Sequence, residues 1–182
     1  MNKYLVIFLR SGGFFGLAMG LFYTLQYQNV SAGVRCGLVT GILFGVSMAA
    51  LSYLSDQKLK KKGIDTSSAH VRRSHKISVT RTARDLIPTC KKAILLIKNS
   101  SLKKEDTETG TLIAKMGMSW NSFGETLEIS LKPLADGRTL IKIASSPSLP
   151  TTIVDFGKNL ENVETVVSYI KQELGDEVRD CA

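Results

Sequence analysis

The residues that could do chemistry in this chain are few, and they do not cluster. Three cysteines, Cys36, Cys90 and Cys181, have no C-x-x-C spacing, and the two histidines, His70 and His75, lie in one basic stretch. A zinc site needs several such ligands grouped together, so we expect no metal and no cofactor. The odd number of separated cysteines predicts free thiols and a reducing compartment.

Acid–base catalysis has two candidates, Asp155 and Glu125. A catalytic carboxyl group needs a positioned partner and surroundings that tune its pKa, and the sequence pattern places no such partner beside either residue. We therefore predict that the protein is not an enzyme. Catalysis by Asp155 or Glu125 is the least favoured alternative.

The segment DFGKN, residues 155–159, leads into a predicted helix. Free N–H groups at a helix N-terminus can bind an anion, so Asp155, Gly157 and Asn159 are candidate contacts for an anion or a partner. The alternative is that Asp155 and Asn159 cap the helix while Gly157 supplies an unusual backbone angle. Trp120, the only tryptophan, is a further candidate, either as a core anchor or as an exposed contact.

Positive charge gathers in one part of the chain. Residues 55–104 hold 14 Lys or Arg and 3 acidic residues, whereas residues 105–182 hold 7 and 13. Basic runs beside a membrane bind anionic lipid and also fix topology, so either role suits this stretch. The candidate lipid contacts are Lys60, Lys61, Lys62, Arg72 and Arg73. No aromatic residue is interleaved for base stacking, which makes nucleic acid an unlikely partner.

Two long apolar runs precede the rest of the chain and must position it. Residues 11–28 and 33–54 are close to the length that crosses a bilayer as a helix, although Arg35 lies near the start of the second. We predict a two-helix transmembrane hairpin over residues 11–54, after an interfacial lead-in over residues 1–10 that is too short for a signal peptide. The basic flanks place both termini in the cytoplasm.

Glycine recurs at every fourth position in both predicted spans. Such a stripe lets two helix backbones approach closely in lipid. Three interpretations are open: packing within one hairpin, packing between protomers of a homo-oligomer, or a pore. The pore is least favoured because neither span carries an ionisable side chain at mid-membrane depth. The stripe consists of Gly12, Gly16, Gly20, Gly33, Gly37, Gly41 and Gly45.

A basic linker over residues 55–75 leads to a predicted cytosolic α+β domain over residues 76–175, followed by a tail over residues 176–182. Alternating and helical apolar patterns give the order β-α-β-β-β-α. The first predicted helix is capped by Asp85, has Pro88 in its first turn and extends to about Lys98. The second closes the domain and is capped by Asn159. We expect a four-stranded, largely antiparallel sheet with two helices on one face, of the helix-grip kind. Residues 100–109 are expected to be a polar connection, and Pro147 and Pro150 to end the last strand.

The end of this domain resembles a bacterial domain family of unknown function. The residues that carry the resemblance are Ser145 and Ser146 at a strand end, then the D-x-G-x-N pattern of residues 155–159, then a last helix. The chain departs from the family at Pro147, Pro150 and Asn162 or Val163. The resemblance covers about 30 residues and implies an α+β fold and a bacterial origin, but no activity.

The sequence thus predicts a multi-pass protein of a bacterial inner membrane that presents a cytosolic domain as a binding or accessory subunit. Its expected partners are membrane lipids and another membrane or cytosolic protein. The alternative is a homo-oligomeric membrane protein packed through the glycine stripe, with or without a pore.

Overall fold

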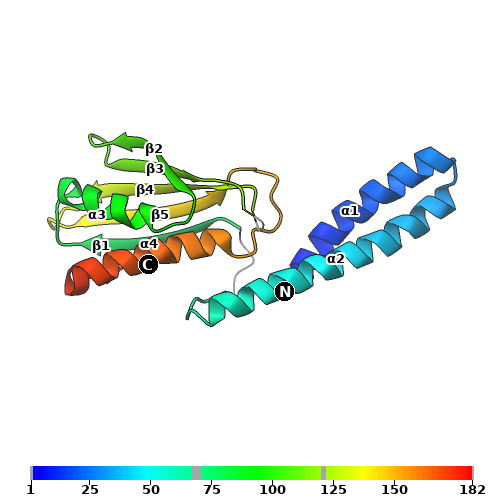
Figure 1. Cartoon of the computed structure of the whole chain (residues 1–182), viewed down its shortest axis with the longest axis horizontal. Helices are drawn as coiled ribbons and strands as arrows, with labels where there is room; N and C mark the ends of the chain where they lie inside the picture. Colours follow the sequence, from blue (N-terminus) through cyan, green and yellow to red (C-terminus); the bar gives the residue numbers. More distant parts are fainter. Residues whose placement is uncertain (1, 67–70, 120–121, 182) are drawn as a thin grey trace. The chain divides into compact units, whose positions relative to one another are not determined.

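The computed structural model describes residues 2–66, 71–119 and 122–181 (Figure 1). They form two compact units, Met1–His70 and Val71–Ala182. The division falls within the basic stretch predicted to be a linker.

The first unit is a helical hairpin of α1, Lys3–Tyr27, and α2, Val30–Lys60. Gln28 adopts a left-handed backbone conformation (φ 51°) between them, and the Asn29 side chain caps α2 by accepting a hydrogen bond from the amide of Ala32. Both helices are long and apolar enough to cross a membrane.

Both helices extend beyond the predicted spans. Residues 3–10 were expected to be a separate lead-in but continue into α1, because no Gly or Pro interrupts the helical backbone before Gly12 and Asn2 caps its start. At the other end, α2 continues six residues past Leu54 to Lys60. The linker therefore begins at Lys61.

The second unit contains a six-stranded antiparallel sheet in the order β2-β3-β4-β5-β1-β6. Four of its strands were expected. The bounds are β1 Arg73–Val79, β2 Ser100–Asp106, β3 Thr111–Met116, β4 Glu125–Pro133, β5 Thr139–Pro147 and β6 Val178–Asp180.

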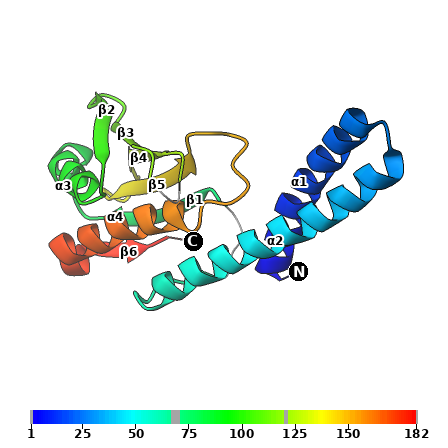
Figure 2. The ribbon, with the colours of Figure 1, turned by 45° about the vertical axis from the view of Figure 1, so that its right-hand side comes forward.

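Two helices, α3 (Ala83–Leu95) and α4 (Lys158–Leu174), cover one face of this sheet (Figures 1 and 2). The stripe predicted for α4 is buried, with Ile170 and Val166 fully enclosed. It packs with Leu86 and Ile94 of α3 against alternating sheet residues such as Ile143. The α+β layer arrangement, with both helices on one face, is as predicted.

The two unpredicted strands lie at the edges. Residues 100–109 were expected to be a connection, but residues 100–106 form β2, which pairs only with β3. An edge strand does not need the apolar alternation of a central one, and Leu102 is its only large apolar side chain. Residues 176–182 were expected to be a tail, yet Val178–Asp180 pairs with β1.

The start of α3 differs from the prediction, whereas β5 ends where the prolines were expected to end it. Thr82, not Asp85, caps α3: its hydroxyl accepts from the amide of Asp85 at 3.3 Å, and Asp85 is the third helical residue. Pro88 therefore lies inside α3 rather than in its first turn. Pro147 ends β5 as its last residue, which is tolerated because β1 pairs with β5 only as far as Ser145.

Candidate functional site

Seven glycines form the interface between α1 and α2, here called the glycine seam: Gly12, Gly16, Gly20, Gly33, Gly37, Gly41 and Gly45. A Cβ atom at Gly16 would lie 2.6 Å from the carbonyl oxygen of Gly37, and one at Gly37 would lie 2.6 Å from that of Gly16. No side chain fits at these distances. The predicted stripe is therefore occupied within one chain.

The two sides of the glycine seam differ. On one side the rings of Phe15 and Phe44 stack with centroids 4.4 Å apart. On the other side, an apolar groove of about 590 Å³ follows the glycines, and Gly13 beside it has no neighbour within 4 Å of a Cβ position. The side chains that line the groove are uncharged: Phe8, Leu9, Leu17, Leu21, Thr24, Val34, Leu38 and Ile42.

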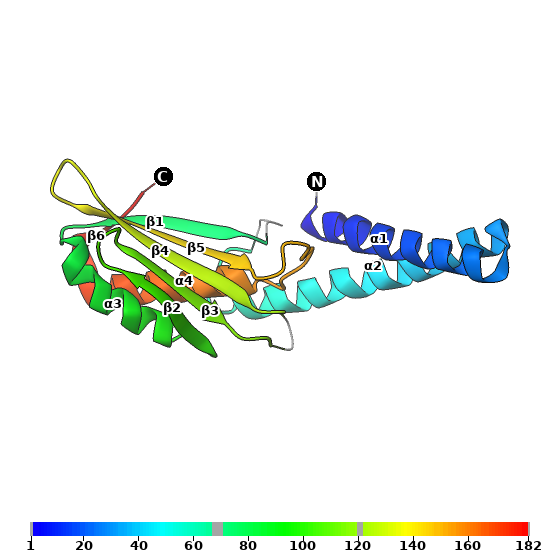
Figure 3. The ribbon, with the colours of Figure 1, turned by 90° about the horizontal axis from the view of Figure 1, so that it is seen from above.

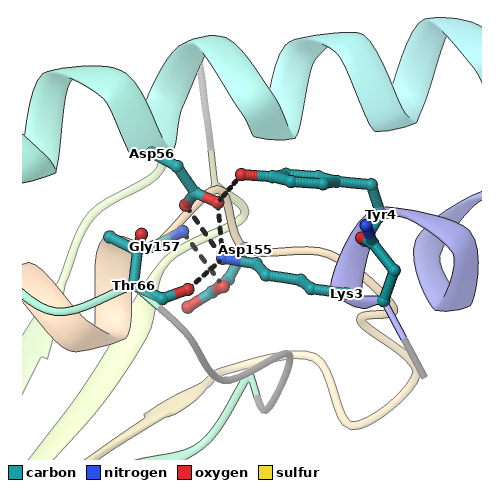
Figure 4. Close-up of polar contacts among 7 residues, drawn as sticks. Lys3, Tyr4, Asp56, Thr66, Asp155 and Gly157 are labelled. Carbon is teal, nitrogen blue, oxygen red and sulfur yellow. Dashed lines mark hydrogen bonds and ion pairs between the residues drawn. The ribbon is translucent and has the colours of Figure 1, made fainter.

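A polar network joins the two ends of the hairpin (Figure 4). The ammonium group of Lys3 donates to both carboxylate oxygens of Asp56, at 2.8 and 2.7 Å, and to the carbonyl oxygen of Thr66 at 3.1 Å. The hydroxyl of Tyr4 donates to Asp56 at 3.0 Å. Sequence reasoning missed this site. The one signal of this site in the sequence is Asp56, a single acidic residue that follows an apolar run and precedes several lysines.

The D-x-G-x-N segment starts α4 through the carboxylate of Asp155 (Figure 4). One oxygen accepts from the amide of Gly157 at 3.2 Å. The other accepts from the amide and the side chain of Asn159, at 3.0 and 2.8 Å. Gly157, with φ 76°, is the N-cap residue and offers no side chain of its own. Asp155 thus supplies the negative charge that favours a helix N-terminus.

Asn159 and Asn162 point from α4 to the end of β5. The hydroxyl of Ser145 donates to the side-chain oxygen of Asn159 at 2.7 Å and accepts from the amide group of Asn162 at 3.4 Å. All three side chains are buried. The Asn162 side-chain oxygen has no hydrogen-bond partner within the described part of the chain.

These contacts decide between the two interpretations of residues 155–159. The amides that would receive an anion already bind the Asp155 carboxylate, so an external anion would have to compete with it. Asn159, expected to be the cap, is instead the second helical residue and binds Ser145. The geometry favours capping over an anion or partner contact.

Both carboxyl groups that were weighed for catalysis are buried and hydrogen-bonded within the domain. Glu125 is 1% exposed and accepts a hydrogen bond from the hydroxyl of Ser122. Asp155 is engaged in capping. Among the described residues, no group of three or more His, Cys, Asp or Glu could hold a metal ion. Trp120 lies outside the described residues.

The cysteines are free thiols among the described residues. Burial in the core raises the pKa of the Cys90 thiol to about 12. A thiol with that pKa is protonated at neutral pH and is a poor nucleophile.

The predicted lipid contacts fall in two places. Lys60 ends α2, Lys61 is its C-cap residue and Lys62 follows, all three exposed. Arg72 is exposed and Arg73 is the first residue of β1. The two groups lie at opposite ends of the linker rather than forming one site in the sequence.

No family model matches this sequence, and no curated protein matches it. One solved structure that is similar to it is the "Crystal structure of Ara h 8.0201". The match has 10% identity and a TM-score of 0.40, and it covers 57% of this chain and 96% of that chain. A likeness this distant carries no argument about function.

Proposed function

We propose that the chain is a membrane-anchored binding or accessory subunit, in which the hairpin spans a bacterial inner membrane and presents the α+β domain to the cytoplasm without catalysis. The observation that carries the proposal is that the hairpin buries small residues and exposes large apolar ones, the opposite of a helix pair in a soluble protein. Six of the seven glycines of the seam are buried, whereas large apolar side chains face outward, among them Leu17, 78% exposed, and Phe14, 71% exposed. A helix pair in water would bury those side chains.

Charge at the helix ends supports the orientation. Lys58, Lys60, Lys61 and Lys62 follow the second span, and Lys3 and Arg10 lie at the start of the first. Around the turn between the helices, Arg35 is the nearest charge. The positive-inside rule then places both termini in the cytoplasm.

The domain supports a binding role more than a catalytic one. Its arrangement of two helices against one face of an antiparallel sheet resembles the helix-grip kind. Four of its buried polar residues, Ser145, Asn159, Asn162 and Asp155, are linked to each other by hydrogen bonds. Their role is to fix α4 to β5 rather than to act on a substrate.

Alkaline carbonate extraction of membranes, followed by native mass spectrometry of the gently solubilised protein, tests this function. The proposal expects the chain to stay in the membrane pellet and to appear as one protomer bound to another protein. Release into the supernatant would contradict the membrane anchor. A single protomer with no specific partner would contradict the accessory role.

The apolar groove favours a second candidate, a homo-oligomer. Because the glycine seam is filled within one chain, a second copy would have to bind the groove side, where Leu17 stands beside Gly13. In that case Gly13→Leu would reduce the mass to that of one protomer. Gly37→Leu with Gly41→Leu would also do so, by separating the helices that form the groove. An unchanged mass in both variants would remove this candidate.

A further inference from the structure

Exposed apolar side chains of the domain gather at one end of its sheet. Seven large apolar side chains are exposed among the described residues of this unit, and only Leu134 is at the β4–β5 turn. The other six lie at the opposite end, in or next to three connections: Leu95 is the last residue of α3 and Leu96 follows it, Met118 and Phe123 lie between β3 and β4, and Leu149 and Ile153 lie between β5 and α4. We call these six residues the apolar rim.

Hydrogen bonds show that the three connections are neighbours. The amide of Gly117 donates to the carbonyl of Asn99 at 3.1 Å, which joins the connection after α3 to the one after β3. The amide of Ser148 donates to the carbonyl of Gly124 at 2.9 Å, which joins the latter to the one after β5. Figure 3 shows the β5–α4 connection at the end of the sheet away from the β4–β5 turn.

The two ends of the domain differ in how many charged residues their connections carry. At the apolar rim, residues 117–124 carry no charge, residues 96–99 carry only Lys98, and the single acid of residues 148–157 is the buried Asp155. The connections at the other end carry four acids, Glu108, Asp136, Asp176 and Glu177, and two bases, Arg81 and Arg138. A contiguous apolar surface without charge marks an interaction site rather than a solvated end.

The chain enters the domain at the apolar rim. Arg73, the first residue of β1, pairs with Ser145, two residues before the end of β5. Twelve residues, 61–72, connect it to α2, and an extended chain of that length spans at most about 40 Å. The connecting chain is therefore attached at the rim end of the domain, where Arg72 and Arg73 lie next to it in sequence, and a membrane-spanning hairpin would keep this end within reach of the bilayer.

We infer that the apolar rim binds the surface of the lipid bilayer, with Phe123, Met118 and Leu149 entering the headgroup region and Arg72 and Arg73 contacting anionic lipid. This inference rests on the proposed membrane anchor. The occupant is lipid rather than a protein, because the tether to the hairpin is attached at this end and the rim has no charged pattern that would select a partner.

The single tryptophan offers a direct test, since Trp120 stands between Met118 and Phe123 in the sequence. The full chain is reconstituted in vesicles of phosphatidylcholine and phosphatidylglycerol, with or without bromine on the acyl chains near the headgroups. Brominated lipid should quench Trp120 emission about two-fold, because aromatic side chains settle at the headgroup level. In the matched control, Trp120→Phe with Leu134→Trp moves the reporter to the other end, where no quenching is expected.

Flotation of the same vesicles separates the two proposals. Equal emission in plain and brominated vesicles, from a chain that floats with them, would overturn lipid binding by the rim and leave the anchor intact. A chain that does not float would overturn both. Phe123→Ser with Leu149→Ser should abolish the quenching without changing flotation. Quenching that persists in this variant would contradict the role of the rim.

Discussion

The hydroxyl of Ser145, at the end of β5, donates a 2.7 Å hydrogen bond to the side-chain oxygen of Asn159 in the first turn of α4. Asp155 holds the other side of the same Asn159 side chain, at 2.8 Å. Ser145, Asp155 and Asn159 are thus members of one hydrogen-bond network. It fixes the direction in which α4 leaves the sheet.

Removing the Ser145 hydroxyl should destabilise this junction. Ser145→Ala leaves buried polar atoms of Asn159 and Asn162 without a partner, which costs about 1–3 kcal/mol of unfolding free energy. Thermal unfolding of the domain, followed by Trp120 fluorescence, measures the loss. Ser146→Ala is the matched control on the other face of β5 and should change little. Equal stability of both variants would contradict a structural role for the network.

The glycine seam should not tolerate a side chain, whereas Gly13 should. Gly37→Leu would place a Cβ atom 2.6 Å from the Gly16 carbonyl oxygen, so the helices must separate. A disulfide between cysteines placed at Phe15 and Phe44 reports their separation. Its yield should fall sharply with Gly37→Leu and stay unchanged with Gly13→Leu. Similar yields in both variants would show that the helices do not pack through these glycines.

Acid should detach β6 from β1. Hydrogen bonds from Lys171 and His75 lower the pKa of Asp180, and those from Arg81 lower the pKa of Glu177. Because both pKa values are below their ordinary values, these ion pairs contribute their full stabilisation of the folded domain above about pH 4.3. That contribution is lost as the pH falls through the lowered pKa values. NMR should show loss of amide protection at Val178 and Arg179 in that acidic range.

The variant Asp180→Asn should weaken that protection at neutral pH and make it less dependent on pH. Asp176→Asn, a nearby exposed acid in the 3₁₀ turn η1 (Gly175–Glu177), serves as the control and should behave like the unmodified chain. Protection of Val178 that is constant from neutral pH into strong acid would contradict the role of these ion pairs.

The Lys3–Asp56 pair should hold the ends of the hairpin together. These side chains are 14% and 2% exposed, so Asp56→Asn leaves an ammonium group without its counter-ion and should cost about 3 kcal/mol. The double variant with Lys3→Met should recover part of that loss in a double-mutant cycle of thermal unfolding in detergent. Lys58→Gln, an exposed neighbour on α2, is the control. Strictly additive losses would mean that the pair is not coupled.

Local patterns were sufficient to predict most of the secondary structure. The apolar runs predicted α1 and α2, and the stripe of Val163, Val166 and Ile170 predicted α4. Alternation predicted the central strands. The edge strands β2 and β6 were missed because a strand paired on one side, or only three residues long, needs little apolar alternation.

The candidate site was harder to predict from the sequence, because the residues that contact each other there are far apart along the chain. Residues 155–159 were correctly identified as the start of a helix, but the bond from Asn159 to Ser145 depends on how α4 packs on the sheet. The pair of Lys3 and Asp56 is 53 residues apart in sequence. The apolar rim also went unnoticed, since its residues come from three separate connections.

Thiol labelling from the two sides of the membrane tests the central claim, that the hairpin spans the bilayer with both termini in the cytoplasm. The probes are Asn29→Cys, in the turn between the helices, and the native Cys181, with Cys36 replaced by serine. A membrane-impermeant maleimide added to intact cells with a permeabilised outer membrane should label position 29 and spare Cys181 until the inner membrane is opened. Labelling of both positions, or of neither, from outside would contradict the account.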